Sequence, residues 1–172
     1  MAAELIHGRG APPEATYIFK HALVQDAAYS SLLRSRRQRI HADIARALAD
    51  RFSDQVEPAP AMIARHYTEA GLSEPAARSW LAASELAVSR SAPVEAGRYA
   101  DAGLALIPGL TNGPALELAL QLVRASALAS LKGFAAPETV STLTEAKRHI
   151  GTLMGPRVSA ATANRRPNLG KR

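Results

Sequence analysis

Cysteine is absent from this sequence of 172 residues. The chain therefore forms no disulfide and no cysteine-ligated zinc site, and it suits a reducing compartment. Aromatic residues are scarce at 5%, whereas hydrophobic residues make up 47% and are mostly alanine and leucine. A core of such side chains favours closely packed helices over a β-sandwich.

Long apolar runs are absent as well. Proline and glycine break the longest charge-free stretches, such as residues 103–116, so no segment is expected to span a membrane. The first ten residues lack the basic start and apolar run of a signal peptide. We therefore expect a cytoplasmic protein without membrane contact.

Motifs for catalysis are also missing. The sequence holds no GxxxxGK[ST] phosphate loop, no HExxH and no GxSxG. Its five histidines form no pair at helical spacing, so they predict no metal site. They are His7, His21, His41, His66 and His149. The chain is accordingly predicted to need no cofactor of its own and to be no enzyme.

The charge is unevenly placed. The formal net charge is +6, but residues 157–172 contribute five basic side chains and no acid, so the rest of the chain is nearly neutral. This pattern predicts a nearly neutral domain with a disordered basic tail over 151–172. A second basic cluster, Arg34–Arg39, allows the alternative of a DNA-binding transcriptional regulator. We favour a solvated or interdomain face for it, because no aromatic side chain interleaves with the arginines, and nucleic acid is not the expected partner.

The hydrophobic pattern predicts a short β-hairpin within residues 2–19, followed only by helices. The second helix shows the clearest pattern, because Ile40, Ile44, Leu48 and Phe52 recur every four residues and predict its buried face. Helix starts are expected at the capping residues Ser73, Ser91 and Asn112. The helices are predicted over 21–33, 35–52, 59–70, 73–90, 91–107, 112–131 and 137–150.

Seven helices with short connections suggest antiparallel pairs, such as those of the tetratricopeptide pattern of about 34 residues. One copy matches at four positions, which are Trp80, Ala96, Gly103 and Pro108. The copy departs from the pattern at Ala83, Ser84, Ala87 and Ala100. In this register Trp80 packs on the inner face of its helix, against the helix that holds Ala96 and Gly103. The predicted fold is all-α, with stacked antiparallel helical hairpins after the short β-hairpin.

Three segments occur in order along the chain: FKHALVQDAAY at 19–29, HYTEAG at 66–71 and KGFAAPE at 132–138. With their surroundings, over about residues 3–150, they closely resemble the region after the ATPase module in a bacterial signalling family. That family joins a class III adenylate/guanylate cyclase domain to an AAA-like ATPase and a tetratricopeptide-like tail. Residues 151–172 depart from the family, which suggests a truncated or frame-shifted reading or a fragment.

The resemblance implies a division of the chain into three parts. Residues 1–33 would be the end of a winged-helix element, 34–150 a helical arm with repeats, and 151–172 the tail. It also implies that His21, at a helix start that favours an anion, contacts a nucleotide phosphate once the ATPase module is present. The implied role is a non-catalytic sensor or scaffold that binds a protein partner or the ATPase and cyclase modules of a longer chain.

Overall fold

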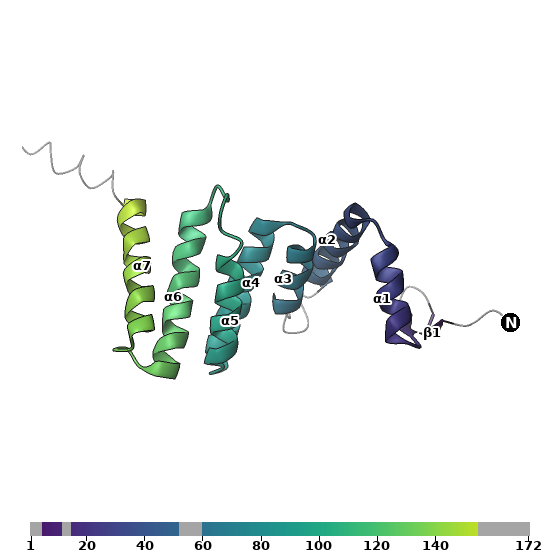
Figure 1. Cartoon of the computed structure of the whole chain (residues 1–172), viewed down its shortest axis with the longest axis horizontal. Coiled ribbons are helices and arrows are strands. Elements are labelled where there is room, and N and C mark those ends of the chain that lie inside the picture. Colours follow the sequence, from purple (N-terminus) through teal and green to yellow (C-terminus); the bar gives the residue numbers. More distant parts are fainter. Residues whose placement is uncertain (1–4, 12–14, 52–59, 155–172) are drawn as a thin grey trace, which may run out of the picture.

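The computed structural model describes residues 5–11, 15–51 and 60–154. These residues are mostly helical, with one small antiparallel hairpin, as the sequence predicts (Figure 1). The strands are β1 (Ile6–Arg9) and β2 (Thr16–Phe19). The helices are α1 (Ala22–Ser31), α2 (Arg34–Arg51), α3 (Pro60–Glu69), α4 (Ser73–Ser89), α5 (Pro93–Leu104), α6 (Gly113–Lys132) and α7 (Pro137–Met154).

The hairpin pairs Ile6 with Phe19 and Arg9 with Thr16. Both strands lie within the predicted range of 2–19, and β1 includes Gly8. A two-stranded hairpin is marginal by itself in water, so it depends on what packs beside it. Within the described residues, its principal neighbour is α1, which contacts β2.

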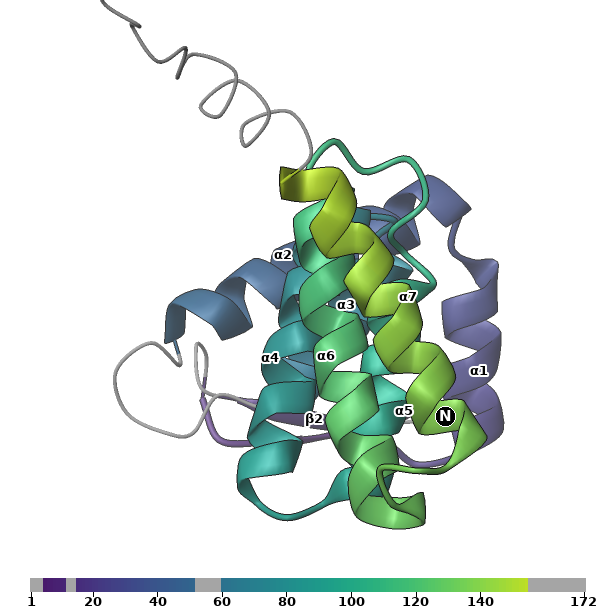
Figure 2. The ribbon, with the colours of Figure 1, turned by 90° about the vertical axis from the view of Figure 1, so that its left-hand side faces the viewer.

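From α2 to α7, each helix packs against the next one in sequence, and α4 also contacts α6. The helices form an elongated row in Figure 1, and Figure 2 looks along that row with α7 and α6 nearest the viewer. The predicted ends of the third and sixth helices are confirmed to within one residue. Gly71, two residues after α3, has a φ of 74°, and Gly133, directly after α6, has a φ of 88°. Glycine adopts this left-handed backbone without steric cost.

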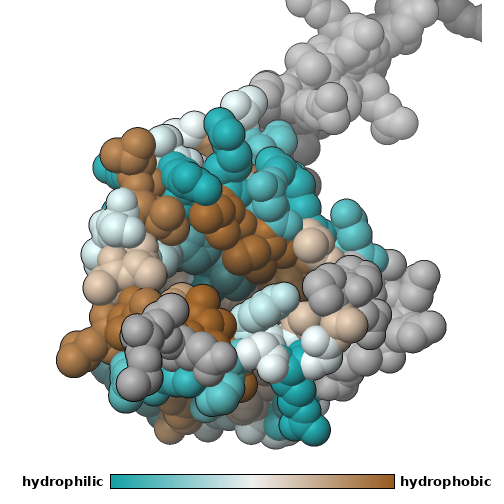
Figure 3. Space-filling model, turned by 90° about the vertical axis from the view of Figure 1, so that its right-hand side faces the viewer, coloured by the Kyte–Doolittle hydropathy of each residue, from teal (hydrophilic) through white to brown (hydrophobic). Residues whose placement is uncertain are grey.

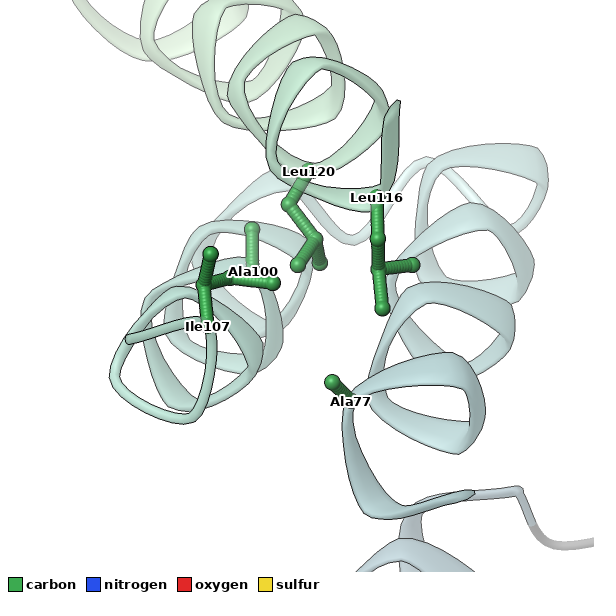
Figure 4. Close-up of a cluster of buried hydrophobic side chains, with 5 residues drawn as sticks. All are labelled: Ala77, Ala100, Ile107, Leu116 and Leu120. Atoms are coloured by element: carbon green, nitrogen blue, oxygen red, sulfur yellow. The ribbon is translucent and has the colours of Figure 1, made fainter. Parts of the chain in front are cut away.

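The largest buried cluster joins α4, α5, α6 and the loop after α5 (Figure 4). Leu120 of α6 is completely buried and points toward Ala100 of α5 and Ala77 of α4. Gly103 makes this approach possible, since a Cβ there would lie only 2.7 Å from Leu120 Cδ2. The cluster consists of Ala77, Ala100, Ile107, Leu116 and Leu120.

The predicted buried face of the second helix is wrong. Ile40 and Ile44 are 40% and 37% exposed, whereas Ala42 and Ala45 are buried. The small side chains of Ala42 and Ala45 are thus the buried ones on α2, which packs against α3. Phe52, the last member of the predicted stripe, lies outside the described residues.

Several predicted helix boundaries also differ. Leu72 and Ala92 are the N-cap residues of α4 and α5, so Ser73 and Ser91 do not cap them, and Ser91 instead has a φ of 56°. α7 continues to Met154, past the predicted start of the tail, and the tail from 155 onward lies outside the described residues. None of the helices in the described ranges combines the length and apolar character that a membrane crossing requires.

Candidate functional site

His21 is the N-cap residue of α1, with extended backbone at φ −136° and ψ 132°. Its side chain is exposed and makes no capping hydrogen bond, whereas its carbonyl oxygen accepts the N–H groups of Val24 and Gln25. The structure thus places His21 at a helix start, as the sequence predicts. The nucleotide contact that the resemblance implies stays a prediction.

α1 contains no buried residue, although the sequence gives it apolar side chains. Leu23 is 82% exposed and Leu33, just after the helix, is 76% exposed. Hydrophobic side chains are visible on this end of the molecule in Figure 3. We call these residues the N-terminal apolar surface: Leu5, Ile6, Tyr17, Ile18, Leu23 and Leu33.

Side chains at one corner connect α1, α2 and α3. The Tyr29 hydroxyl lies 3.0 Å from His41 Nε2, and His41 Nδ1 lies 2.8 Å from His66 Nδ1. The pKa of His66 is lowered, first by burial and then by the neighbouring His41 and Arg65, while Glu69 opposes this shift. Sequence reasoning missed this contact because His41 and His66 are 25 residues apart and meet only when α2 packs on α3.

The basic cluster Arg34–Arg39 begins α2 beside this corner. The Arg37 guanidinium lies 5.2 Å from the Tyr29 ring centroid, and its Nη1 is 3.5 Å from the Tyr29 carbonyl oxygen. Arg34 and Arg37 line an open cavity of about 420 Å³ that Glu69 also borders. The other lining residues are Tyr29, Ser30, Gln38, Thr68 and Gly71. One arginine of the cluster is therefore engaged within the fold, and the DNA-binding alternative stays a prediction.

A larger groove of about 650 Å³ lies between α3, α4 and α5, and we call it the Trp80 groove. Trp80 is 9% exposed, its Nε1–H donates to Thr68 Oγ1 at 3.1 Å, and its ring stacks on Tyr99 with centroids 5.5 Å apart. Arg98 lies 5.3 Å from the centroid of the same tyrosine. The groove is lined by Ala61, Met62, Arg65, Trp80, Arg98, Tyr99 and Ala102.

The four residues of the predicted repeat are distributed as follows. Trp80, Ala96 and Gly103 are buried, and Pro108 is exposed in the loop that follows α5. Gly103 lies against Trp80, because a Cβ there would be 3.3 Å from Trp80 Cβ. The sequence gives no signal that Arg65 and Arg98 share this groove, because they lie on α3 and α5, which are separated by α4 along the chain.

No metal site is evident in residues 5–11, 15–51 and 60–154, where no three His, Asp or Glu side chains are grouped to hold an ion.

No family model matches the chain, and no solved structure matches it. Over 117 residues it is 31% identical to an uncharacterized protein of Rhizobium meliloti (strain 1021). That stretch is 68% of this chain but only 11% of the relative, so the match covers a small part of the relative's length.

Proposed function

We propose that this chain is a non-catalytic helical-repeat segment of a longer signalling protein, in which it binds other modules of that protein. The observation that carries the proposal is the N-terminal apolar surface. A helix as apolar as α1 normally buries one face, yet α1 buries no residue against the rest of the described chain. Exposed apolar side chains gathered at one end of a molecule are typical of interaction sites.

The identity of the neighbouring modules follows from the resemblance. We infer an AAA-like ATPase linked to a nucleotide cyclase, in a cytoplasmic bacterial protein, with catalysis residing in those modules. In this arrangement the exposed His21, at the positive end of the α1 dipole, is available to a nucleotide phosphate held by the ATPase module. The much greater length of the Rhizobium meliloti relative supports a multi-module context.

The remaining helices would form a tetratricopeptide-like stack. Contacts between consecutive helices and the α4–α6 contact support this arrangement, in which each helix pair buries its apolar face against the next. Signalling would proceed as a population shift between a state with α1 docked on the ATPase module and a state with α1 released.

The absence of cysteine permits a direct test. A Leu23→Cys variant carries a single thiol on the N-terminal apolar surface, and its rate of alkylation by iodoacetamide reports exposure. The reaction is repeated in the presence of the Rhizobium meliloti relative from which the matched stretch has been deleted. We expect alkylation to become about tenfold slower, which corresponds to mostly bound protein.

Val94→Cys is the matched control, because Val94 is also strongly exposed, at 63%, but lies on α5. Its alkylation rate should not change when the remainder of the relative is added. Equal rates for Leu23→Cys with and without that protein would contradict docking through α1.

A further inference from the structure

We propose that the Trp80 groove is a second binding site, which takes an acidic peptide segment carrying apolar side chains beside its carboxylates. This surface lies between α3, α4 and α5, so it is separate from the N-terminal apolar surface. The proposal therefore goes beyond docking between modules and is tested independently of it.

The wall of the groove suits apolar side chains. Met62 is 42% exposed there, and Ala61 and Ala102 leave room beside it because their side chains are small. Tyr99 is half-buried and held in place by its stacking on Trp80. An immobilised aromatic pair beside an accessible methionine gives apolar contact area at little cost in conformational entropy.

The charge of the groove specifies the partner. Arg65 and Arg98 line it from α3 and α5, and neither forms an ion pair with any residue in the described parts of the chain. Other arginines of the same helical row do have partners, since Arg78 pairs with Glu74 at 2.7 Å and Arg124 with Asp101 at 2.7 Å. Two cations that find no acidic partner in the described ranges, placed beside an apolar wall, complement carboxylates and repel a basic segment.

The shape of the site favours a peptide over nucleic acid. Nucleotide bases bind by stacking on accessible aromatic faces, whereas Trp80 is 9% exposed and uses its ring against Tyr99. The volume of about 650 Å³ and the position between three helices suit a short stretch of polypeptide. Arginine, tyrosine, tryptophan and methionine are also the residues enriched where proteins bind one another.

The test is a selection of random peptides displayed on phage, performed on the whole chain and on an Arg65→Gln/Arg98→Gln variant. We expect the unaltered chain to enrich peptides that combine Asp or Glu with Leu, Phe or Ile, and the double variant to lose this enrichment. Enrichment without acidic residues, equal enrichment by the double variant, or none at all would overturn the proposal.

The most enriched peptide is then synthesised and titrated while the emission of Trp80, the single tryptophan, is recorded. The double variant should weaken binding by about tenfold or more. Arg46→Gln is the matched control, because Arg46 is an exposed arginine of α2 paired with Asp43, and its change should leave binding unaltered. Unchanged thermal stability of all variants would show that they are folded. Equal affinity of the double variant and the control would refute the assignment.

Discussion

His41 on α2 and His66 on α3 face each other through their Nδ1 atoms, which lie 2.8 Å apart. Such a pair holds only when one Nδ1 carries a proton and the other offers a lone pair. Since His41 Nε2 also meets the Tyr29 hydroxyl, the contact continues into α1. Full protonation of both imidazoles would place two N–H groups and two positive charges against each other at the α2–α3 contact.

The histidine pair predicts a loss of stability in mild acid. Burial, His41 and Arg65 hold the pKa of His66 below its ordinary value of 6.5, while Glu69 opposes them. The folded chain therefore binds fewer protons than the unfolded chain once the pH falls below 6.5. The stability contribution is complete above pH 6.5 and is lost as the pH falls through the lower folded pKa. The thermal midpoint, measured from about pH 7.5 to pH 5, should decrease in this window.

His66→Gln should make that decrease shallower, because it removes the group whose pKa differs between the two states. His7→Gln is the control, since His7 is exposed on the hairpin and has no part in the pair. If the two variants and the unaltered chain showed the same dependence on pH, the His41–His66 contact would not be responsible.

A second prediction compares two glycines of α5. A Cβ on Gly97 would have Ala127 Cβ as its nearest neighbour at 3.8 Å, whereas one on Gly103 would lie 2.7 Å from Leu120 Cδ2. Gly97→Ala should stabilise the chain by about 0.5–1 kcal/mol through helix propensity. Gly103→Ala gains the same propensity but overpacks a fully buried leucine, so it should destabilise by about 1–3 kcal/mol.

Urea unfolding of the two variants measures both effects in the same helix. Opposite changes in the unfolding midpoint are expected, with similar slopes. Stabilisation by both substitutions would mean that α5 and α6 are farther apart at Gly103 than the 2.7 Å approach to Leu120 requires.

The order of the elements could be predicted because it depends on local signals. β-Branched and aromatic residues around a segment rich in glycine and proline indicate the hairpin. Gly71 and Gly133 follow helices with backbone angles that other residues avoid. The buried face of α2 could not be predicted in this way. Ile40 and Ile44 follow helical spacing but are partly exposed, whereas Ala42 and Ala45 are the buried side chains of this helix.

The proposed interaction surfaces were predictable only in part. His21 and Trp80 were found because they occupy special positions in a local pattern, at a helix start and in a repeat register. Arg65 and Arg98 share the Trp80 groove only because α3 and α5 both flank α4, and the spacing of 33 residues carries no such signal. The same limit applies to His41 and His66.

A third prediction concerns Gln121, which is buried on α6 with 8% of its surface exposed. Its Oε1 atom has no hydrogen-bond partner among the residues that the structure describes. Leucine has a similar size and removes the unsatisfied oxygen, so Gln121→Leu should leave stability unchanged or raise it by about 1 kcal/mol. A fall in the urea midpoint equivalent to more than about 1 kcal/mol would show that the amide has a favourable interaction.

The last prediction separates the ring of Trp80 from its hydrogen bond. The ring is buried among Ala64, Ala83 and Tyr99, and its Nε1–H reaches Thr68 Oγ1 at 3.1 Å. Trp80→Ala should cost about 3–5 kcal/mol, since it empties a large space between α3, α4 and α5. Thr68→Val should cost only about 0.5–1.5 kcal/mol, because it keeps the packing and removes the acceptor.

The native emission of this single tryptophan should be blue-shifted and move to the red on unfolding. A cost below about 0.5 kcal/mol for Trp80→Ala, or water-like emission in the native state, would place the indole at the surface and contradict the buried position that the groove requires.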